Sequence, residues 1–153
     1  MSPSPVTFHQ IIIGRIHLSL ARFLERRSLG IALIAPMDVF LSETNVYQPD
    51  VIFISSERRN IITEKGIEGA PDLVVEVLSP STARYDKGSK LKIYARTGVK
   101  EMWLVDPEAK NIQIFRLDEN AEIPAATRGD NAFLSSSLLP GWKLKTSTIF
   151  KPW

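Results

Sequence analysis

Hydrophobic residues recur at helical spacing near the N-terminus of the chain. The stripe consists of Ile12, Ile13, Ile16, Leu20, Phe23 and Leu24. Steps of three and four residues place these side chains on one face of a helix. The pattern predicts an amphipathic helix from His9 to about Arg27, ended by Gly30, with its apolar face towards a core.

The remaining apolar segments have the lengths and residue types of strands. Pro49 marks the entry to one of them, and Gly98 ends a second helix. That helix is expected from about Thr82 or Asp86 to Thr97. The predicted strands are one or two short strands within residues 31–41, then Gln48–Ser55, Asp72–Leu78, Glu101–Asp106 and Asn111–Leu117.

Four segments have weaker patterns. Residues 1–8 are expected to be a flexible, proline-containing lead-in, and residues 56–70 a charged connection with one helical turn. Residues 118–137 are polar and predicted to be loosely structured. The tail, residues 138–153, carries Trp142 and is expected to pack back on the body.

The order of these elements indicates the fold class. A strand–helix–strand step, from residue 72 to residue 106, implies a parallel pair of strands with a right-handed crossover. The hairpin formed by residues 101–117 adds antiparallel pairing. We therefore predict an α/β or α+β fold, a mixed β-sheet flanked by helices, and a single domain over residues 1–153.

Composition narrows the function classes. The 153 residues are 44% hydrophobic and 24% charged, as is usual for a globular protein. The chain has no cysteine and two histidines, which excludes disulfides and thiolate metal sites. It has no apolar run of membrane-spanning length and no signal-peptide pattern at its start, so we expect a cytoplasmic protein. A net charge of +2 permits nucleic-acid binding without arguing for it.

Glu76 is the most unusual position in the sequence. It lies within the apolar run Leu73–Leu78, which is typical of a strand buried on both faces of a sheet. A buried carboxylate without a partner costs several kcal/mol or stays protonated. Glu76 therefore requires a partner, and a metal ion, an exchangeable proton and a buried Lys or Arg are the three alternatives.

Asp50 and Lys90 suggest which partner Glu76 has. Asp50 begins a strand directly after a proline, and Lys90 lies on the helix that follows Glu76. Two carboxylates from neighbouring strands suit Mg²⁺ or Mn²⁺, and the backbone carbonyl of Val77 is a further candidate ligand. A nearby lysine would position water or neutralise charge on a phosphate. The set Asp50, Glu76 and Lys90 is therefore a candidate site for phosphodiester hydrolysis.

Other polar residues have simpler interpretations. Asp72 follows Pro71 at a strand start; a second metal ligand is one interpretation, and a loop acid is the favoured one. Tyr94 is expected to be a half-buried core residue. The pair Asp86 and Lys90 has the spacing of a surface ion pair. His9 is interpreted as a helix-end residue and not as a ligand. His17 lies off the apolar stripe as a surface or boundary residue. The sequence contains no glycine-rich phosphate loop, HExxH or GxSxG motif.

Several ordered motifs resemble a known family. They are Gly69–Thr82 (GAPDLVVEVLSPST), Tyr85–Lys90 (YDKGSK), Tyr94-Ala95, Gly98-Val99 and Glu101–Pro107 (EMWLVDP). Together they resemble the Uma-two family of bacterial proteins, which is related to the PD-(D/E)XK nuclease superfamily. The resemblance covers about residues 9–117. Family members usually have more sequence ahead of the first helix, including an acidic stretch.

The resemblance implies a restriction-endonuclease-like core with a magnesium-type site. Pro49-Asp50 matches the PD step, which makes Asp50 a metal ligand, and Glu76 matches the second acid. The superfamily lysine stands two residues after that acid, where this chain has Leu78. Lys90 matches the displaced lysine, with Lys87 and Lys92 as rivals.

The expected function follows from the family. It is a Mg²⁺- or Mn²⁺-dependent endonuclease acting on DNA, and a homodimer is expected because cutting both strands needs two sites. The alternative is a catalytically inactive nucleic-acid-binding or regulatory module on the same fold. A third possibility is a hydrolase of small phosphate esters, which predicts an enclosed pocket.

Overall fold

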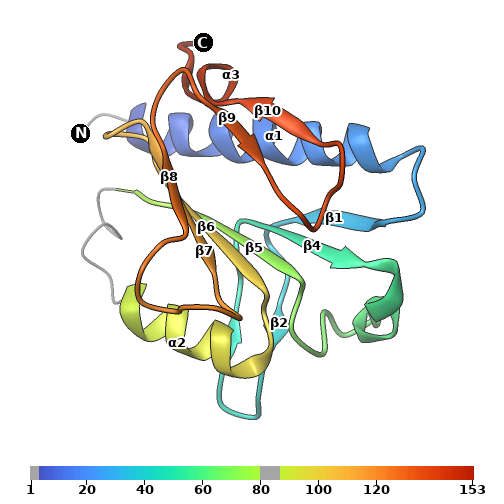
Figure 1. The fold of residues 1–153 in the computed structure, drawn as a ribbon. Coiled ribbons are helices and arrows are strands. Elements are labelled where there is room, and N and C mark those ends of the chain that lie inside the picture. The colour runs from blue at the N-terminus through green and yellow to red at the C-terminus, as the bar shows by residue number, and fades with distance from the viewer. Residues whose placement is uncertain (1–3, 80–86) are drawn as a thin grey trace.

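A six-stranded mixed sheet lies between two helices in the computed structural model, which describes residues 4–79 and 87–153 (Figure 1). Helix α1 (Ser4–Leu24) covers one face of the sheet, and helix α2 (Lys87–Thr97) covers the other. The strands of the main sheet are β1 (Gly30–Ile34), β4 (Val51–Ser55), β5 (Leu73–Val77), β6 (Glu101–Asp106), β7 (Asn111–Arg116) and β8 (Ala126–Arg128). The predicted α+β architecture, a mixed sheet flanked by helices, is confirmed.

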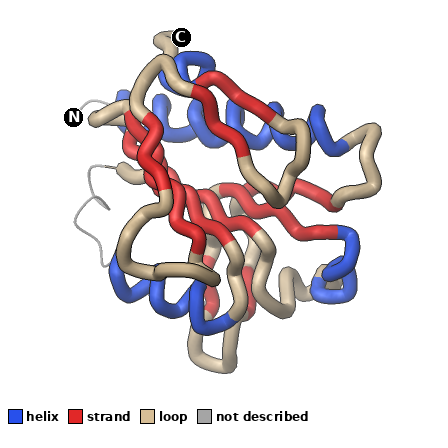
Figure 2. Tube along the Cα trace, viewed as in Figure 1, coloured by secondary structure: helices blue, strands red, loops and turns tan. Residues whose placement is uncertain are grey.

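The strand order in the sheet is β1-β4-β5-β6-β7-β8. Strands β5 and β6 are parallel, and the other neighbouring pairs are antiparallel. The parallel step contains α2, as the strand–helix–strand pattern predicts. The remaining elements are the hairpin of β2 (Val39–Phe40) and β3 (Val46–Tyr47), the 3-10 helix η1 (Ser56–Ile61), the hairpin of β9 (Phe133–Ser135) and β10 (Lys143–Lys145), and the terminal helix α3 (Thr146–Phe150) (Figure 2).

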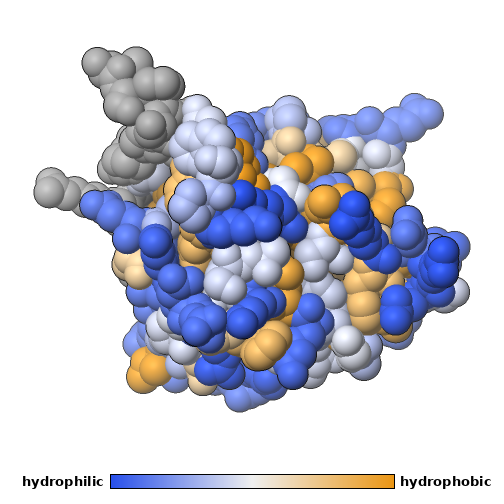
Figure 3. Space-filling model, turned by 90° about the horizontal axis from the view of Figure 1, so that it is seen from above, coloured by the Kyte–Doolittle hydropathy of each residue, from blue (hydrophilic) through white to orange (hydrophobic). Residues whose placement is uncertain are grey.

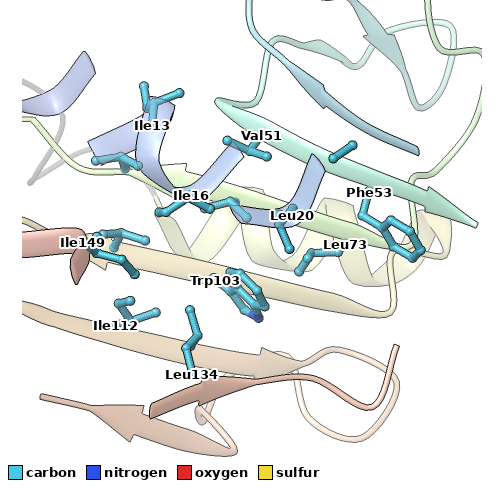
Figure 4. Close-up of a cluster of buried hydrophobic side chains, with 14 of the residues drawn as sticks. Ile13, Ile16, Leu20, Val51, Phe53, Leu73, Trp103, Ile112, Leu134 and Ile149 are labelled. Atoms are coloured by element: carbon cyan, nitrogen blue, oxygen red, sulfur yellow. The ribbon is translucent and has the colours of Figure 1, made fainter. Parts of the chain in front are cut away.

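Two hydrophobic clusters lie on opposite faces of the sheet. The first joins the buried stripe of α1 to the sheet and to the C-terminal segment, with Trp103 near its centre (Figure 4). The second lies against α2 and includes Leu91 and Tyr94. Along β5, Leu73, Val75 and Val77 belong to the first cluster and Val74 to the second. This strand is therefore buried on both faces, as predicted.

The N-terminal helix begins earlier than predicted. Helix α1 starts at Ser4 and ends at Leu24, so the expectation of a flexible lead-in is wrong for residues 4–8. A proline in the first turn of a helix loses no hydrogen bond, because the first N–H groups have no partner within the helix. The Phe8 ring also stacks on the ring of Trp153, with centroids 5.6 Å apart.

The polar segment 118–137 is more ordered than predicted. It contains β8 and β9, and Leu134 of β9 is fully buried in the first cluster. The Ser136 hydroxyl, next to β9, donates a 3.0 Å hydrogen bond to the buried carboxylate of Glu101 on β6. Strands of three residues are too short to show a period of two, which is why the sequence pattern missed them.

The C-terminal tail packs on the body as predicted. Leu139, Trp142, Ile149 and Phe150 are all buried in the first cluster. Residues 56–70 contain η1, in agreement with the expected helical turn. The expected start of the second helix, at Thr82 or Asp86, lies outside the described residues.

The face above α1 and the C-terminal hairpin has a mixed surface. Seen from that side, hydrophobic areas are interrupted by hydrophilic residues (Figure 3). None of the helices within residues 4–79 and 87–153 has the length and hydrophobicity needed to cross a membrane.

Candidate active site

The candidate site forms where β4 begins beside the end of β5. The register pairs Val51 with Val75, so Asp50 and Glu76 are the next residues on the two strands. Pro49 has no N–H group, and β4 starts only at Val51. The backbone groups of Val77 therefore meet side chains in place of a neighbouring strand.

Asp50 binds one of these backbone groups. The Val77 N–H donates a 2.7 Å hydrogen bond to Oδ2 of Asp50. The Asp50 carbonyl oxygen in turn accepts a 3.0 Å hydrogen bond from the Ala35 N–H, which fixes the backbone at this point. Burial raises the pKa of the Asp50 carboxyl group, while the Val77 N–H and the charges of His9 and Lys90 act in the opposite direction. Asp50 thus lies under the influence of His9 from α1 and of Lys90 from α2.

Glu76 projects from β5 towards α2. Its Oε2 accepts a 2.7 Å hydrogen bond from the Tyr94 hydroxyl and lies 3.3 Å from Nζ of Lys90. Lys90 and Tyr94 are four residues apart, so one face of α2 presents both donors. The partner that the sequence required for Glu76 is therefore a lysine together with a tyrosine.

Burial has the largest effect on the pKa values of Glu76 and Tyr94. It raises the pKa of Glu76, and the charge of Asp50 raises it further. The charge of Lys90 and the hydrogen bonds from Tyr94 and Lys90 oppose this effect. The pKa of Tyr94 is raised far above its usual range, first by burial and then by the Glu76 carboxylate, so its hydroxyl keeps its proton and remains a donor.

Two tyrosine rings frame Lys90. Its Nζ lies 5.3 Å from the centroid of the Tyr47 ring, within the range of a cation–π contact. Tyr47 and Tyr94 meet edge to face, with ring centroids 5.5 Å apart. Tyr47 belongs to β3, three residues before Asp50, so the β2–β3 hairpin borders the site.

His9 reaches the same place from α1. Its Nε2 lies 2.8 Å from the carbonyl oxygen of Val77 and 3.7 Å from Oδ2 of Asp50. The side chains of His9 and Asp50 are 19% and 18% exposed, so both border solvent. The interpretation of His9 as a helix-end residue is wrong, because α1 begins at Ser4 and His9 contacts Val77 and Asp50 from within the helix. A signal was available, because His9 precedes Ile12 and Ile13 by three and four residues and so continues the buried stripe.

The acidic residues suit a hard divalent cation. Among the described residues, no donor forms a hydrogen bond with Oδ1 of Asp50 or Oε1 of Glu76, so each carboxylate keeps one oxygen available. Carboxylate oxygens are the ligands that Mg²⁺ and Mn²⁺ prefer. Within residues 4–79 and 87–153, no group of three or more His, Cys, Asp or Glu side chains could hold a metal ion together. A metal centre here would therefore need backbone or substrate oxygens or water as well.

The structure brings together the three residues that the sequence singled out. Asp50 and Glu76 are the residues next to the paired Val51 and Val75 on neighbouring strands β4 and β5, and Lys90 contacts Glu76. Of the two rival lysines, Lys92 is exposed and lies two residues further along α2, which turns it away from Lys90. The side chain of Lys87 lies outside the described part of the chain.

Two other interpretations change. Asp72 lies in a bend just before β5, as expected of a loop acid, but it is only 1% exposed. Its Oδ2 accepts a 2.7 Å hydrogen bond from the Ser55 N–H, and its Oδ1 lies 3.2 Å from Nζ of Lys100. Tyr94 is a core residue, as expected, but it is fully buried and not half-buried, and its hydroxyl binds Glu76. His17 is half-buried with Nε2 3.2 Å from the Ala32 carbonyl, consistent with a boundary residue.

Comparison with known proteins gives the family. The profile of the Uma2 family, described as "Putative restriction endonuclease", matches residues 1–147. The chain belongs to this family. No curated protein matches the chain. Among solved structures, it is similar to the crystal structure of a "putative nuclease belonging to DUF820" from Anabaena variabilis ATCC 29413. The TM-score is 0.74 at 18% identity, over 94% of this chain and 80% of that one.

These comparisons agree with the architecture. A structural likeness at 18% identity establishes the fold alone, and the neighbour's fold is the mixed sheet flanked by helices described above. Membership of the Uma2 family indicates a restriction-endonuclease-like nuclease. The chemistry of this chain then depends on its own residues.

Proposed function

We propose that this Uma2-family protein is a metal-dependent endonuclease that hydrolyses phosphodiester bonds in DNA. The observation that carries the proposal is the convergence of Asp50, Glu76 and Lys90 at the end of β5. A half-buried glutamate with a raised pKa, next to a second acid with a raised pKa, is costly to stability. Perturbed carboxylates gathered at one place are typical of functional sites.

Asp50 and Glu76 would hold Mg²⁺ or Mn²⁺ through carboxylate oxygens. When bound, such an ion lowers the pKa of a water molecule and stabilises charge on a phosphate. The Val77 N–H holds the Asp50 carboxylate in place, and the Tyr94 hydroxyl does the same for Glu76. The two acids are thereby oriented before a substrate arrives, which lowers the entropic cost of reaching the reactive geometry.

Lys90 would act on the substrate. Its side chain is 28% exposed and its Nζ lies 3.3 Å from Oε2 of Glu76, so it can reach a phosphate placed next to that carboxylate. There it would neutralise the negative charge that grows on the phosphate in the transition state, or orient the attacking water. The Tyr47 ring limits the directions in which the Lys90 side chain can move.

The partners follow from the family and the chemistry. DNA is the substrate that a restriction-endonuclease-like family implies. Cleavage of both strands needs two copies of the site, which favours a homodimer with twofold symmetry. We place the protein in the cytoplasm, where DNA and Mg²⁺ are available.

Plasmid cleavage tests this function. Wild type, Asp50→Asn, Glu76→Gln and Lys90→Gln are each incubated with supercoiled plasmid and Mg²⁺ or Mn²⁺. We expect nicked or linear product from the wild type only. Asp106→Asn is a matched control, because Asp106 is an acid whose carboxylate accepts hydrogen bonds in the β6–β7 turn. Equal cleavage by wild type and by all three site variants would contradict the proposed site.

One observation favours a second candidate function, a non-catalytic nucleic-acid-binding or regulatory module. The Glu76 carboxylate already has a lysine and a tyrosine as partners, so it does not need a metal ion as its partner. In that case the wild type would bind DNA without cleaving it, and the Asp50→Asn variant would bind DNA equally well. Gel-shift and cleavage assays on the same samples separate the two functions.

A further inference from the structure

His9 stands where a third metal ligand would stand. Its Nε2 is 2.8 Å from the Val77 carbonyl oxygen and 3.7 Å from Oδ2 of Asp50. Ligand atoms bound at about 2.1 Å to one ion are about 3 Å apart at a right angle and about 4 Å apart when opposite. The 3.7 Å distance lies within this span, and the 2.8 Å distance lies just below its lower end. An ion bound to His9 Nε2 would therefore have an Asp50 carboxylate oxygen and the Val77 carbonyl oxygen as the oxygens beside it.

The proton on His9 now occupies part of this space. A carbonyl oxygen only accepts hydrogen bonds, so in the 2.8 Å contact Nε2 carries the proton. Oδ2 of Asp50, 3.7 Å from Nε2, is a second oxygen on the same side of the imidazole. A cation that replaced the proton would meet the same two oxygens. A histidine that binds a metal ion through Nε2 carries its proton on Nδ1.

We propose that His9 is a metal ligand of this site and that it makes the site prefer Mn²⁺ and similar transition-metal ions to Mg²⁺. The proposal rests on the metal centre proposed above and adds His9 and the Val77 carbonyl to Asp50. Imidazole nitrogen is a good ligand for transition metals, whereas Mg²⁺ selects oxygen ligands. One nitrogen among oxygen ligands therefore shifts the preference from Mg²⁺ to Mn²⁺.

A purely structural role for His9 is the competing explanation. Because β4 starts only at Val51, the Val77 carbonyl has no strand partner, and His9 supplies a hydrogen bond that the backbone needs. A glutamine could donate the same hydrogen bond through its amide, but it is a much weaker ligand for Mn²⁺ than imidazole. The variant His9→Gln therefore separates the two roles.

His17 provides a matched control. It is the only other histidine in the chain and lies two turns later on the same helix. It is half-buried, and its Nε2 also lies near a strand carbonyl, 3.2 Å from that of Ala32. The variant His17→Gln makes the same chemical change in the same helix away from Asp50.

Pulsed electron paramagnetic resonance of Mn²⁺ bound to the full chain tests the proposal. We expect a nitrogen hyperfine coupling in the wild type and in His17→Gln, and its loss in His9→Gln. We also expect His9→Gln to weaken Mn²⁺ binding by about tenfold or more, which is the size of effect seen when a residue that supports a metal site is removed. Mg²⁺ affinity should change by less than about threefold. Isothermal titration calorimetry supplies both affinities.

The possible results have distinct meanings. Mn²⁺ that binds to wild type without nitrogen coupling, and is lost in Asp50→Asn, would overturn the role of His9 while leaving the metal centre in place. Nitrogen coupling that persists in His9→Gln would also overturn it. Absence of Mn²⁺ binding to wild type would overturn both this proposal and the proposed metal-dependent function. Circular dichroism of His9→Gln identifies any loss of structure.

Discussion

The Tyr94 hydroxyl donates a 2.7 Å hydrogen bond to Oε2 of Glu76, the same oxygen that Lys90 approaches. The two residues come from different layers of the fold, Tyr94 from α2 and Glu76 from β5. Both donors use Oε2, so the contact sets the rotation of the carboxylate. It also leaves Oε1 as the oxygen that a cation or a substrate can approach.

The variant Tyr94→Phe should destabilise the protein by about 1.5–3 kcal/mol, the range for a hydrogen bond to a charged group. It should also raise the pKa of Glu76 further, because the Tyr94 hydroxyl lowers that pKa at present. Urea denaturation measures the first effect. A nuclear magnetic resonance titration of labelled glutamate carboxyl groups measures the second.

Tyr47→Phe is the control for this change. Tyr47 packs on Tyr94 through its ring, and its hydroxyl forms no hydrogen bond with the residues that the structure describes. The variant Tyr47→Phe should leave the pKa of Glu76 unchanged. If Tyr94→Phe and Tyr47→Phe had equal effects on that pKa, the hydrogen bond would not orient Glu76 as inferred.

The pH dependence of stability should reveal the buried acids. Burial raises the pKa values of Asp50 and Glu76 in the folded state, so the folded protein binds protons more tightly than the unfolded chain. This contribution to stability is fully present below the unfolded pKa values, near pH 4, and is lost as pH rises through the raised folded values. Ionisation of these acids therefore lowers the free energy of unfolding towards neutral pH.

The double variant Asp50→Asn, Glu76→Gln cannot ionise at these positions. Its Tm should exceed that of wild type by more at pH 7 than at pH 4. Thermal unfolding followed by circular dichroism between these pH values measures the difference. Glu101, whose pKa burial also raises, is present in both proteins, so its contribution cancels. A difference that stays constant with pH would contradict the raised pKa values.

Divalent ions should stabilise the folded protein through the same acids. An ion that binds only the folded state at 100 times its Kd adds about 2.7 kcal/mol. We expect Mn²⁺ to raise the Tm of wild type at pH 7, and a chelator to reverse the rise. Asp50→Asn should abolish the effect, and Asp106→Asn, in the β6–β7 turn, should retain it. Equal stabilisation of the two variants would show that the ion binds elsewhere.

Asp72 should differ from Glu76 in every assay. Its carboxylate binds the Ser55 N–H and lies near Lys100, which places it within the structure of β4 and β5. Asp72→Ala should cost about 1–3 kcal/mol, because a partly buried N–H loses its acceptor. Mn²⁺ affinity of the folded fraction should not change. Lys100→Gln should cost under about 1 kcal/mol, since Lys100 is half exposed.

Local patterns predicted the main architecture because each large element has a long enough repeat. The stripe of α1 and the apolar run of β5 belong to the two clusters that the sheet separates. Short elements such as β9 were missed, since Leu134 is the only buried residue in three. The start of α1 was predicted too late for a different reason. Pro5 was interpreted as part of a flexible lead-in, although proline is well tolerated in the first turn of a helix.

Part of the candidate site could also be predicted from the sequence, and part could not. Asp50, Glu76 and Lys90 were predicted because each is a charged residue placed next to an apolar or proline-marked strand or on the following helix. His9 and Tyr94 lie on the buried stripes of α1 and α2, and a residue on an apolar stripe is usually core. Only their contacts with Val77 and Glu76 distinguish them from core residues.

The sequence by itself determined that Glu76 must have a polar partner, because burial of a carboxylate in an apolar strand carries a free-energy cost in any fold. Tertiary structure alone decided which groups meet it and Asp50. Lys90 and Tyr94 reach Glu76 from one face of the sheet, and His9 reaches Asp50 from the other. The contacts of Glu76 join residues 14 and 18 positions apart, and the contact of His9 with Val77 joins residues 68 positions apart. Strand register and helix packing therefore set these contacts, and no local pattern contains them.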